Sequence, residues 1–205
     1  MKRQMAVLLI GGAFLSGCAS LSEDECRVAN WYEVGYSDAT GGYQSGRISD
    51  HREACAPVGV KVDLNGYLSG YQQGLQVYCS RQTGFKLGKN GNAFPSQCRA
   101  VNREEVELGY VRGSEVHRLL DQRQSLLESR KEKVDQIHAL DKEIAELRQK
   151  IKKSDSHYKS HLYRDLQSLE KLRSRLDEEL YSLDRMMDDL SRHAQLMESD
   201  FYRGR

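Results

Sequence analysis

The sequence predicts a mainly α-helical protein. It has a small, disulfide-linked helical head with a short hairpin or ordered loop, followed by a long antiparallel coiled-coil helical hairpin. Glycine and cysteine are concentrated in the first hundred residues, which hold 14 of the 17 glycines and all five cysteines. A glycine–tyrosine motif recurs in the same stretch, whereas the rest of the chain carries a heptad repeat. We therefore expect a head over residues 26–101 and a hairpin over residues 102–205.

The N-terminal residues predict a lipoprotein. A basic start precedes an apolar run that is too short to span a bilayer and is typical of a signal peptide. The run ends in the letters LSGC, which resemble the bacterial lipobox, with Cys18 as the acylated residue. We expect a signal peptide over residues 1–17 and a lipid-anchored linker over residues 18–25. The alternative is an ordinary signal peptide with an incidental cysteine.

The residue after Cys18 and the overall charge indicate location and partners. Ala19, rather than Asp, follows the cysteine, which resembles the sorting signal for the outer membrane and its periplasmic side. The membrane is thus one expected partner, through the lipid on Cys18. The chain has 31 basic and 30 acidic residues, so no basic surplus indicates binding to nucleic acid.

Four cysteines remain in the head: Cys26, Cys55, Cys79 and Cys98. Outside the cytoplasm an even number of cysteines indicates disulfides, here two. Three connectivities are possible, and the sequence does not select one. We favour Cys79–Cys98, which closes one loop and leaves Cys26–Cys55. A zinc site is the alternative, but the cysteines lack the close C-x2–4-C spacing of zinc ligands.

A pair of small residues, one helical turn apart and with a tyrosine directly after the first of them, occurs three times. The three pairs are Gly35 and Ala39, Gly70 and Gly74, and Gly109 and Gly113. Glycine inside a helix costs about 1 kcal/mol relative to alanine, and close helix–helix approach is a physical reason to accept that cost. We expect helices over residues 28–46 and 64–79, the second capped by Asp63. We also expect all three pairs to meet where the head packs against the base of the coiled-coil hairpin, which we call the arm. The alternative is that these segments are loops.

The segment between Cys79 and Cys98 predicts a short hairpin or an ordered loop. Asn90-Gly91 is a turn signal with Phe85 and Phe94 on either side. The glycines of residues 84–91 lack the Lys-Ser/Thr ending of a phosphate-binding loop, so we do not assign a phosphate site there.

One set of head residues resembles a known family. The set consists of Trp31, Gly35, Asp38, His51, Cys55, Tyr67, Gly70, Gly74, Leu75, Tyr78, Cys79, Gly84, Gly88, Gly91 and Cys98. It resembles the bacterial lipoproteins grouped as domain of unknown function 2799, over about residues 26–115. That family shows Asp-Gly where this chain has Asp38-Ala39. The resemblance implies an envelope location and a fold, and it implies no catalytic residue.

The second half of the chain contains two apolar seams with alternating steps of three and four. The first seam is Val116, Leu119, Arg123, Leu126, Arg130, Lys133, Ile137, Leu140, Ile144, Leu147 and Ile151. The second is Leu162, Leu166, Leu169, Arg173, Leu176, Leu180, Leu183, Met187, Leu190, Ala194, Met197 and Phe201. Both are typical of a coiled coil.

One antiparallel register pairs the two seams over their whole length, from Ile151 with Leu162 to Val116 with Met197. The reversal should lie near residues 154–156, whose side chains favour turns and N-caps. The alternative is one unbroken helix that dimerises.

Three basic residues lie on the first seam: Arg123, Arg130 and Lys133. We favour the hypothesis that they extend along the seam to acidic partners. The alternative is that they mark where a third helix or another protein docks.

The sequence does not indicate a catalytic, metal or cofactor site. His157 and His161 are spaced like two metal ligands, but no accompanying HExxH pattern supports a site. His51 fits a structural hydrogen-bonding residue better than a catalytic base, because no Gly-x-Ser-x-Gly motif is present.

Two functions remain. The first is a non-enzymatic envelope scaffold whose coiled coil binds a protein partner. The alternative is a small envelope enzyme or ligand-binding module that acts on the cell wall through His51, Asp38 and the head tyrosines.

Overall fold

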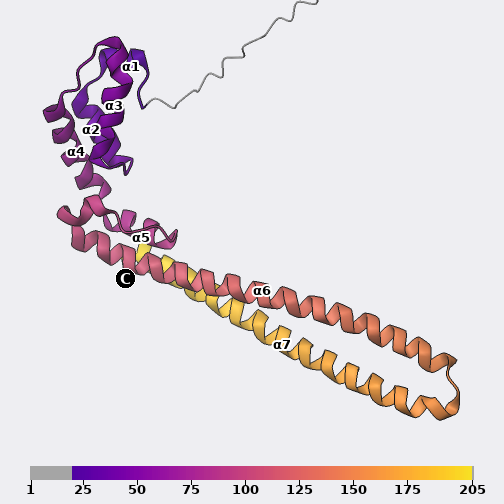
Figure 1. The fold of residues 1–205 in the computed structure, drawn as a ribbon. Helices are drawn as coiled ribbons and strands as arrows, with labels where there is room; N and C mark the ends of the chain where they lie inside the picture. Colours follow the sequence, from indigo (N-terminus) through magenta and orange to yellow (C-terminus); the bar gives the residue numbers. More distant parts are fainter. Residues whose placement is uncertain (1–19, 205) are drawn as a thin grey trace, which may run out of the picture. The chain divides into compact units, whose positions relative to one another are not determined.

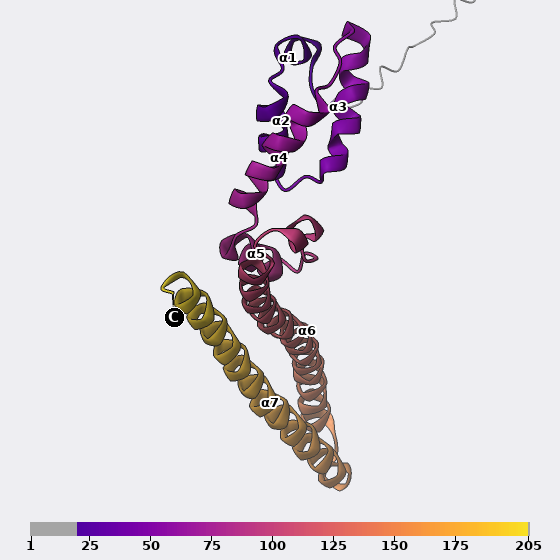
Figure 2. The ribbon, with the colours of Figure 1, turned by 90° about the vertical axis from the view of Figure 1, so that its left-hand side faces the viewer.

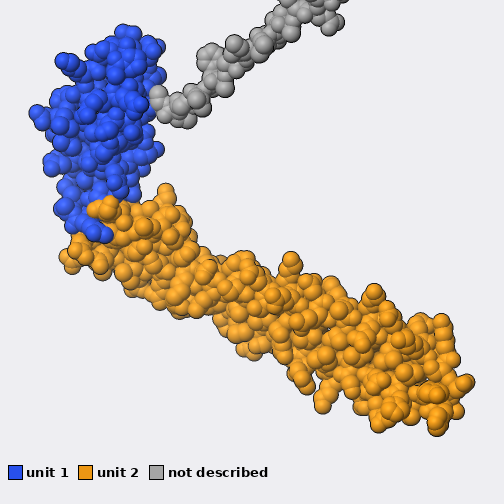
Figure 3. Space-filling view, viewed as in Figure 1, with its two compact units in different colours: residues 1–79, 97–102 blue, residues 80–96, 103–205 orange. Residues whose placement is uncertain are grey.

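The computed structural model describes residues 20–204, and these residues form helices and turns without a strand. The predicted mainly α-helical class is confirmed. Figure 3 shows two compact units. Among the described residues, unit 1 comprises residues 20–79 together with Gln97–Asn102, and unit 2 comprises Ser80–Ser96 together with residues 103–204. This division differs from the expected boundary after residue 101, because Ser80–Ser96 packs with the arm.

The part of unit 1 before Ser80 contains four α-helices and two short 3-10 helices. They are α1 (Glu23–Val28), α2 (Trp31–Thr40), η1 (Ser45–Arg47), α3 (Ile48–Cys55), η2 (Ala56–Val58) and α4 (Leu64–Tyr78). Helices α2 and α4 lie side by side in both views of the ribbon (Figures 1 and 2). The buried residues of unit 1 lie mainly along this pair and on α3.

The boundaries of these helices follow from local capping. The Asp63 side chain accepts hydrogen bonds from the backbone N–H groups of Asn65 and Gly66, both at 3.0 Å, so the predicted N-cap of α4 is confirmed. The single helix expected over residues 28–46 is wrong. Asn30 caps α2 through the Tyr32 N–H, and the chain then turns at Gly42, whose φ is 81°.

Two disulfides cross-link unit 1, and they have the favoured connectivity. Cys26–Cys55 joins α1 to the end of α3, and Cys79–Cys98 joins the end of α4 to the returning chain. Cys98 belongs to the short 3-10 helix η3 (Ser96–Ala100). The Gln97 side chain also donates to the Gly42 carbonyl oxygen at 3.0 Å. These bonds explain why residues 97–102 belong to unit 1.

Unit 2 contains α5 (Arg81–Lys89), α6 (Arg103–Lys153) and α7 (Ser156–Tyr202). The hairpin or ordered loop expected after Cys79 is therefore wrong for most of that segment. Ser80 caps a nine-residue helix by accepting from the Thr83 N–H, and the helix packs along α6. The Asn90-Gly91 turn signal is confirmed, but it ends α5 rather than joining two strands, and Gly91 has a φ of 69°.

The arm is a helical hairpin, and the single unbroken helix is wrong. Helices α6 and α7 run antiparallel, with the reversal between Lys153 and Ser156 (Figures 1 and 2). Every residue of the two predicted seams is buried or half-buried. Val116, Leu119 and Ala194 share one core cluster, and Met197 packs against it. The predicted register places Leu119 opposite Ala194 and Val116 opposite Met197, in agreement with that cluster.

Ion pairs across the seam agree with the same register. The Arg130 guanidinium lies 2.6 Å from the Asp184 carboxylate, next to the seam position expected to face it. Lys133 pairs with Glu179 in the same way. Arg130 and Lys133 thus reach acidic partners on α7, as we expected, whereas Arg123 forms no ion pair with a described residue. Such half-exposed pairs add little stability individually.

The returning end of α7 packs on α5. Phe201 stacks on Phe85 with ring centroids 3.9 Å apart, and Phe85 is only 1% exposed. Lys89 forms an ion pair with Glu198 beside this contact. The hairpin base is therefore part of the same core as α5.

Candidate functional site

The glycine pairs of unit 1 bring two parallel helices into backbone contact. A Cβ added at Gly35 would lie 2.8 Å from the Tyr67 carbonyl carbon, and one added at Gly70 would lie 2.7 Å from the Tyr32 carbonyl carbon. Each glycine therefore faces, on the partner helix, the residue three positions before the partner glycine. One turn later, a Cβ at Gly74 would lie 2.7 Å from the Ala39 Cβ. No side chain fits between α2 and α4 at this crossing.

Unit 2 repeats the arrangement with different helices. A Cβ at Gly84 on α5 would lie 2.9 Å from the Val106 carbonyl carbon, and one at Gly109 on α6 would lie 2.8 Å from the Arg81 carbonyl carbon. Gly88 and Gly113 occupy the next turn of the two helices and are equally close to the partner backbone. The reciprocal relation matches unit 1.

The expected meeting of three motifs at one contact is therefore wrong. Gly35 and Gly70 pair with each other in unit 1, and Gly109 pairs with Gly84 in unit 2. Our sequence reasoning missed Gly84 and Gly88 as packing residues. Their four-residue spacing, the same as in the other motifs, was the available signal.

A buried polar cluster lies beside the α2–α4 crossing. Asp38 on α2 accepts a hydrogen bond from the Tyr67 hydroxyl at 2.7 Å, and the same carboxylate oxygen lies 2.8 Å from His51 Nε2. Asp38 is 6% exposed, Tyr67 is 0% exposed and His51 is 1% exposed. Three separate helices thus supply one hydrogen-bonded group, as a buried carboxylate requires.

Two further residues complete the cluster, and sequence reasoning had given neither a role. Arg47 Nε lies 3.2 Å from the second carboxylate oxygen of Asp38, and its guanidinium stacks 3.6 Å over the Tyr43 ring. Ser20 Oγ lies 2.8 Å from His51 Nδ1. Both nitrogens of His51 therefore have a partner, and the imidazole is fixed at both ends. No local pattern connects these residues, because they come from different elements.

The cluster affects the ionisation of its tyrosine. Burial raises the pKa of Tyr67 well above its ordinary value, and the hydrogen bond to the Asp38 carboxylate raises it further. Burial also raises the pKa values of Tyr71 and Tyr78 on the same helix. All three phenols are thus held in the protonated form in the folded head.

These raised pKa values predict a loss of stability in alkaline solution. A phenol whose pKa is higher in the folded state stabilises the fold fully below its unfolded pKa of about 10, and this contribution is lost as the pH rises through the folded value. We expect the urea midpoint of unit 1 to fall above pH of about 10, and Tyr67→Phe to make that fall shallower. Tyr158→Phe, at a residue that is 69% exposed, is the control. Equal slopes for Tyr67→Phe, Tyr158→Phe and the unchanged protein would contradict the prediction.

The line from Ser20 through His51 to Asp38 contains the residue types of a serine-hydrolase triad. In a triad, however, the carboxylate orients the histidine and stabilises its protonated form, and the serine must be accessible to the substrate. Here the Asp38 carboxylate also accepts a hydrogen bond from Tyr67 and pairs with Arg47, so it does not act on His51 alone, and Ser20 is half-buried. This arrangement fits a structural role, in which hydrogen bonds connect Ser20 to α2, α3 and α4.

The structure offers no metal site in the part of the chain that it describes. Residues 20–204 contain no group of three or more His, Cys, Asp and Glu side chains placed to hold an ion. His157 and His161 lie exposed near the start of α7, and His157 packs edge-on against Tyr158.

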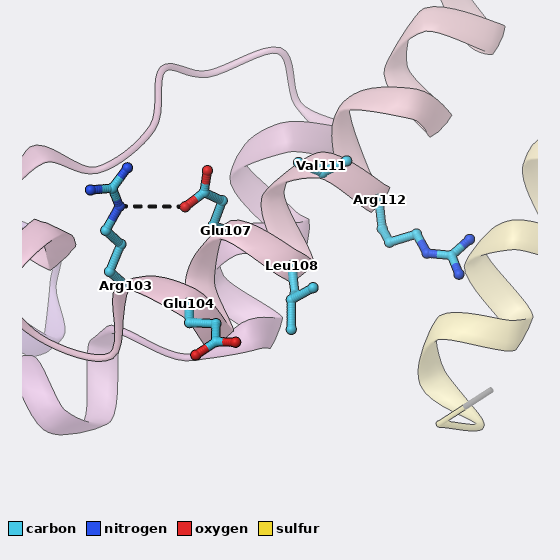
Figure 4. Close-up of a pocket in the computed structure, with 6 residues that line it drawn as sticks. All are labelled: Arg103, Glu104, Glu107, Leu108, Val111 and Arg112. Carbon is cyan, nitrogen blue, oxygen red and sulfur yellow. Dashed lines mark ion pairs between the residues drawn. The ribbon is translucent and has the colours of Figure 1, made fainter.

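A surface hollow of about 520 Å³ lies on α6 in unit 2 (Figure 4). Its walls are Arg103, Glu104, Glu107, Leu108, Val111 and Arg112. The Arg103 guanidinium pairs with Glu107 at 3.4 Å on one side, and Leu108 and Val111 are half-exposed. All six lining residues belong to the first turns of α6.

Comparison with known proteins assigns the head to a family. Residues 30–115 match the family described as "Protein of unknown function (DUF2799)". These residues form a DUF2799 domain. The match begins at the N-cap of α2 and ends just after Gly113, so this DUF2799 domain contains both glycine-packed helix pairs. Searches of curated proteins and of solved structures found no match.

The predicted lipidation residue, Cys18, lies outside the described residues, as does the whole predicted signal peptide. Within residues 20–204, none of the helices has the length and apolar character needed to cross a bilayer. The arm beyond residue 115 is an addition to the DUF2799 domain, and it continues α6 without a break.

Proposed function

We propose that this chain is a non-enzymatic scaffold of the bacterial envelope, held on the periplasmic side of the outer membrane by a lipid on Cys18. Its DUF2799 head is the base, and its helical hairpin binds a protein partner. The observation that carries this proposal is the arm itself. Helix α7 has 47 residues, which corresponds to about 70 Å, and most of that length extends beyond the core that α5 shares with the hairpin base.

The surface of the arm supports a role in protein binding. A two-helix coiled coil buries one seam and leaves the outer faces in solvent. Leu172, Tyr181 and Leu196 on α7 are 40%, 66% and 62% exposed. Tyrosine is among the residue types enriched at the hot spots of protein interfaces.

Two features of the head support an envelope location. Disulfides persist in oxidising compartments such as the periplasm, and the head has two of them. Ser20 is fixed by His51, and Ser22 caps α1 through Glu25, so only Ala19 separates Cys18 from the folded head. A lipid on Cys18 would thus hold the head directly at the membrane surface, without a flexible spacer.

Radiolabelled palmitate tests the anchor in cells. We expect the unchanged chain to incorporate label and to fractionate with the outer membrane. Cys18→Ala should do neither, and globomycin should cause the precursor to accumulate. Serine at position 16 offers a matched control, because Ser16→Ala keeps a small residue before the cysteine and should leave labelling intact. Labelling that survives Cys18→Ala would contradict the proposal.

The second candidate function is hydrolysis of an envelope component, and the Ser20–His51–Asp38 line is the observation that favours it. An active serine nucleophile would react covalently with a fluorophosphonate probe. Labelling that requires Ser20 and His51 would support an enzyme. If the folded protein is not labelled, the hydrogen bonds among Ser20, His51 and Asp38 have a structural role only.

A further inference from the structure

The tip of the arm concentrates basic charge in an otherwise balanced chain. We call the segment from Arg148 to Arg164 the tip, and it contains the reversal at the far end of the α6–α7 pair (Figure 1). Six basic residues lie in it, and Asp155 is its single acidic residue. The basic residues are Arg148, Lys150, Lys152, Lys153, Lys159 and Arg164.

Most of this charge is not neutralised within the protein. Along the middle of the arm, Arg130, Lys133 and Arg173 all pair with carboxylates of the facing helix. At the tip, Arg148 pairs with Glu170, but the other five basic side chains form no ion pair with any described residue. All of the tip's basic side chains are exposed except Lys159, which is half-buried.

Helix stability does not account for the whole cluster. Lys152 and Lys153 lie in the last turn of α6, where positive charge is favourable because of the helix dipole. Lys159 lies in the first turn of α7, where the same dipole makes positive charge unfavourable, whereas Arg164 lies more than one turn further along, where the dipole has little effect. No residue of the first turn of α7 is acidic, and Asp155 occupies the N-cap position just before it. Lys159 therefore adds charge at the tip against a local cost, and Arg164 adds charge that the dipole does not favour, which indicates an external anion.

The accompanying side chains indicate the kind of anion. Tyr158 and Tyr163 alternate with the basic residues and are 69% and 54% exposed. Tyrosine is enriched where proteins meet the membrane interface. Four of the five unpaired basic residues are lysines, which are depleted in the cores of protein interfaces but suit a diffuse anionic surface. We propose that the tip of the arm binds an anionic phospholipid surface.

The charge pattern also orients this contact. Glu143, Glu146 and Asp165 lie directly behind the tip on the two helices. An anionic surface attracts basic residues only within roughly one Debye length, about 8 Å at physiological salt. The arm therefore meets the membrane end-on, through the tip alone. This contact does not depend on lipid at Cys18, so it gives the protein a second membrane attachment.

Vesicle sedimentation tests the proposal. The probe is the chain from Ala19 onward, which retains every described residue and lacks the lipid, secreted so that its disulfides form. We expect it to sediment with phosphatidylglycerol-containing vesicles at low salt, to bind pure phosphatidylcholine vesicles weakly, and to dissociate as salt is added. Lys152→Gln with Lys153→Gln should lower the partition coefficient about 30-fold.

The control variant makes the same charge change elsewhere on α6. Lys131 and Lys142 are exposed and form no ion pair with described residues, so Lys131→Gln with Lys142→Gln should leave binding unchanged. Equal losses in both double variants, or no sedimentation with anionic vesicles, would overturn the proposal. Binding to polyglutamate in place of vesicles, with the same dependence on Lys152 and Lys153, would also overturn it, since the partner would then be an acidic protein.

Discussion

Gly70→Ala is expected to destabilise unit 1 by at least about 2 kcal/mol, although alanine is the better helix former by about 1 kcal/mol. The reason is that the new Cβ would meet the Tyr32 carbonyl group, which is backbone of α2 and cannot move aside without separating the helices. Gly109→Ala should do the same in unit 2, because its Cβ would meet the Arg81 carbonyl group. Urea unfolding monitored by circular dichroism measures both.

Gly46→Ala is the matched control for this result. A Cβ at Gly46 meets no atom within 4 Å, and the residue is exposed in η1. The substitution should therefore be neutral or slightly stabilising. If Gly70→Ala and Gly109→Ala also stabilised the protein, the glycine motifs would not be packing sites.

Asp38→Ala is expected to cost about 3–5 kcal/mol, because it removes the acceptor at the centre of the buried cluster. The Tyr67 hydroxyl and His51 Nε2 would lose their hydrogen-bond partner inside the protein, and Arg47 would lose its counter-charge. Differential scanning calorimetry of the oxidised protein measures the loss, with the disulfides intact in every variant.

Asp50→Ala on α3 gives the comparison. Asp50 neighbours His51 in sequence but is exposed, and it forms no ion pair with a described residue. Its loss should change stability by less than about 0.5 kcal/mol. An equally small effect of Asp38→Ala would show that the cluster does not hold α2, α3 and α4 together, and a catalytic role would then need reconsideration.

The arm could be predicted from the sequence almost residue by residue. Its seams repeat every seven residues, and this period depends only on helix geometry. The antiparallel register follows because both seams must bury their apolar residues at once. The ion pair between Arg130 and Asp184 follows from this register, because the long arginine side chain can extend past the seam to the facing helix.

The head was less predictable because its contacts are set by tertiary packing. Helix α5 contains Gly84 and Gly88, which disfavour a helix locally, and its contact with α6 stabilises it nonetheless. The glycine motifs are also too alike for sequence to say which pairs with which. Similarly, nothing near Ser20 indicates that a residue expected in a linker would bond His51.

The central claim is that the arm, and not a catalytic head, makes the contact with a partner. Site-specific photo-crosslinking in living cells tests it most directly, with a benzophenone amino acid at Leu172, Tyr181 or Leu196 on α7. Val28 on α1 is the head control, since it is 83% exposed. We predict a discrete protein adduct from at least one arm position and none from Val28. Adducts from Val28 alone, with none from the three arm positions, would contradict the account.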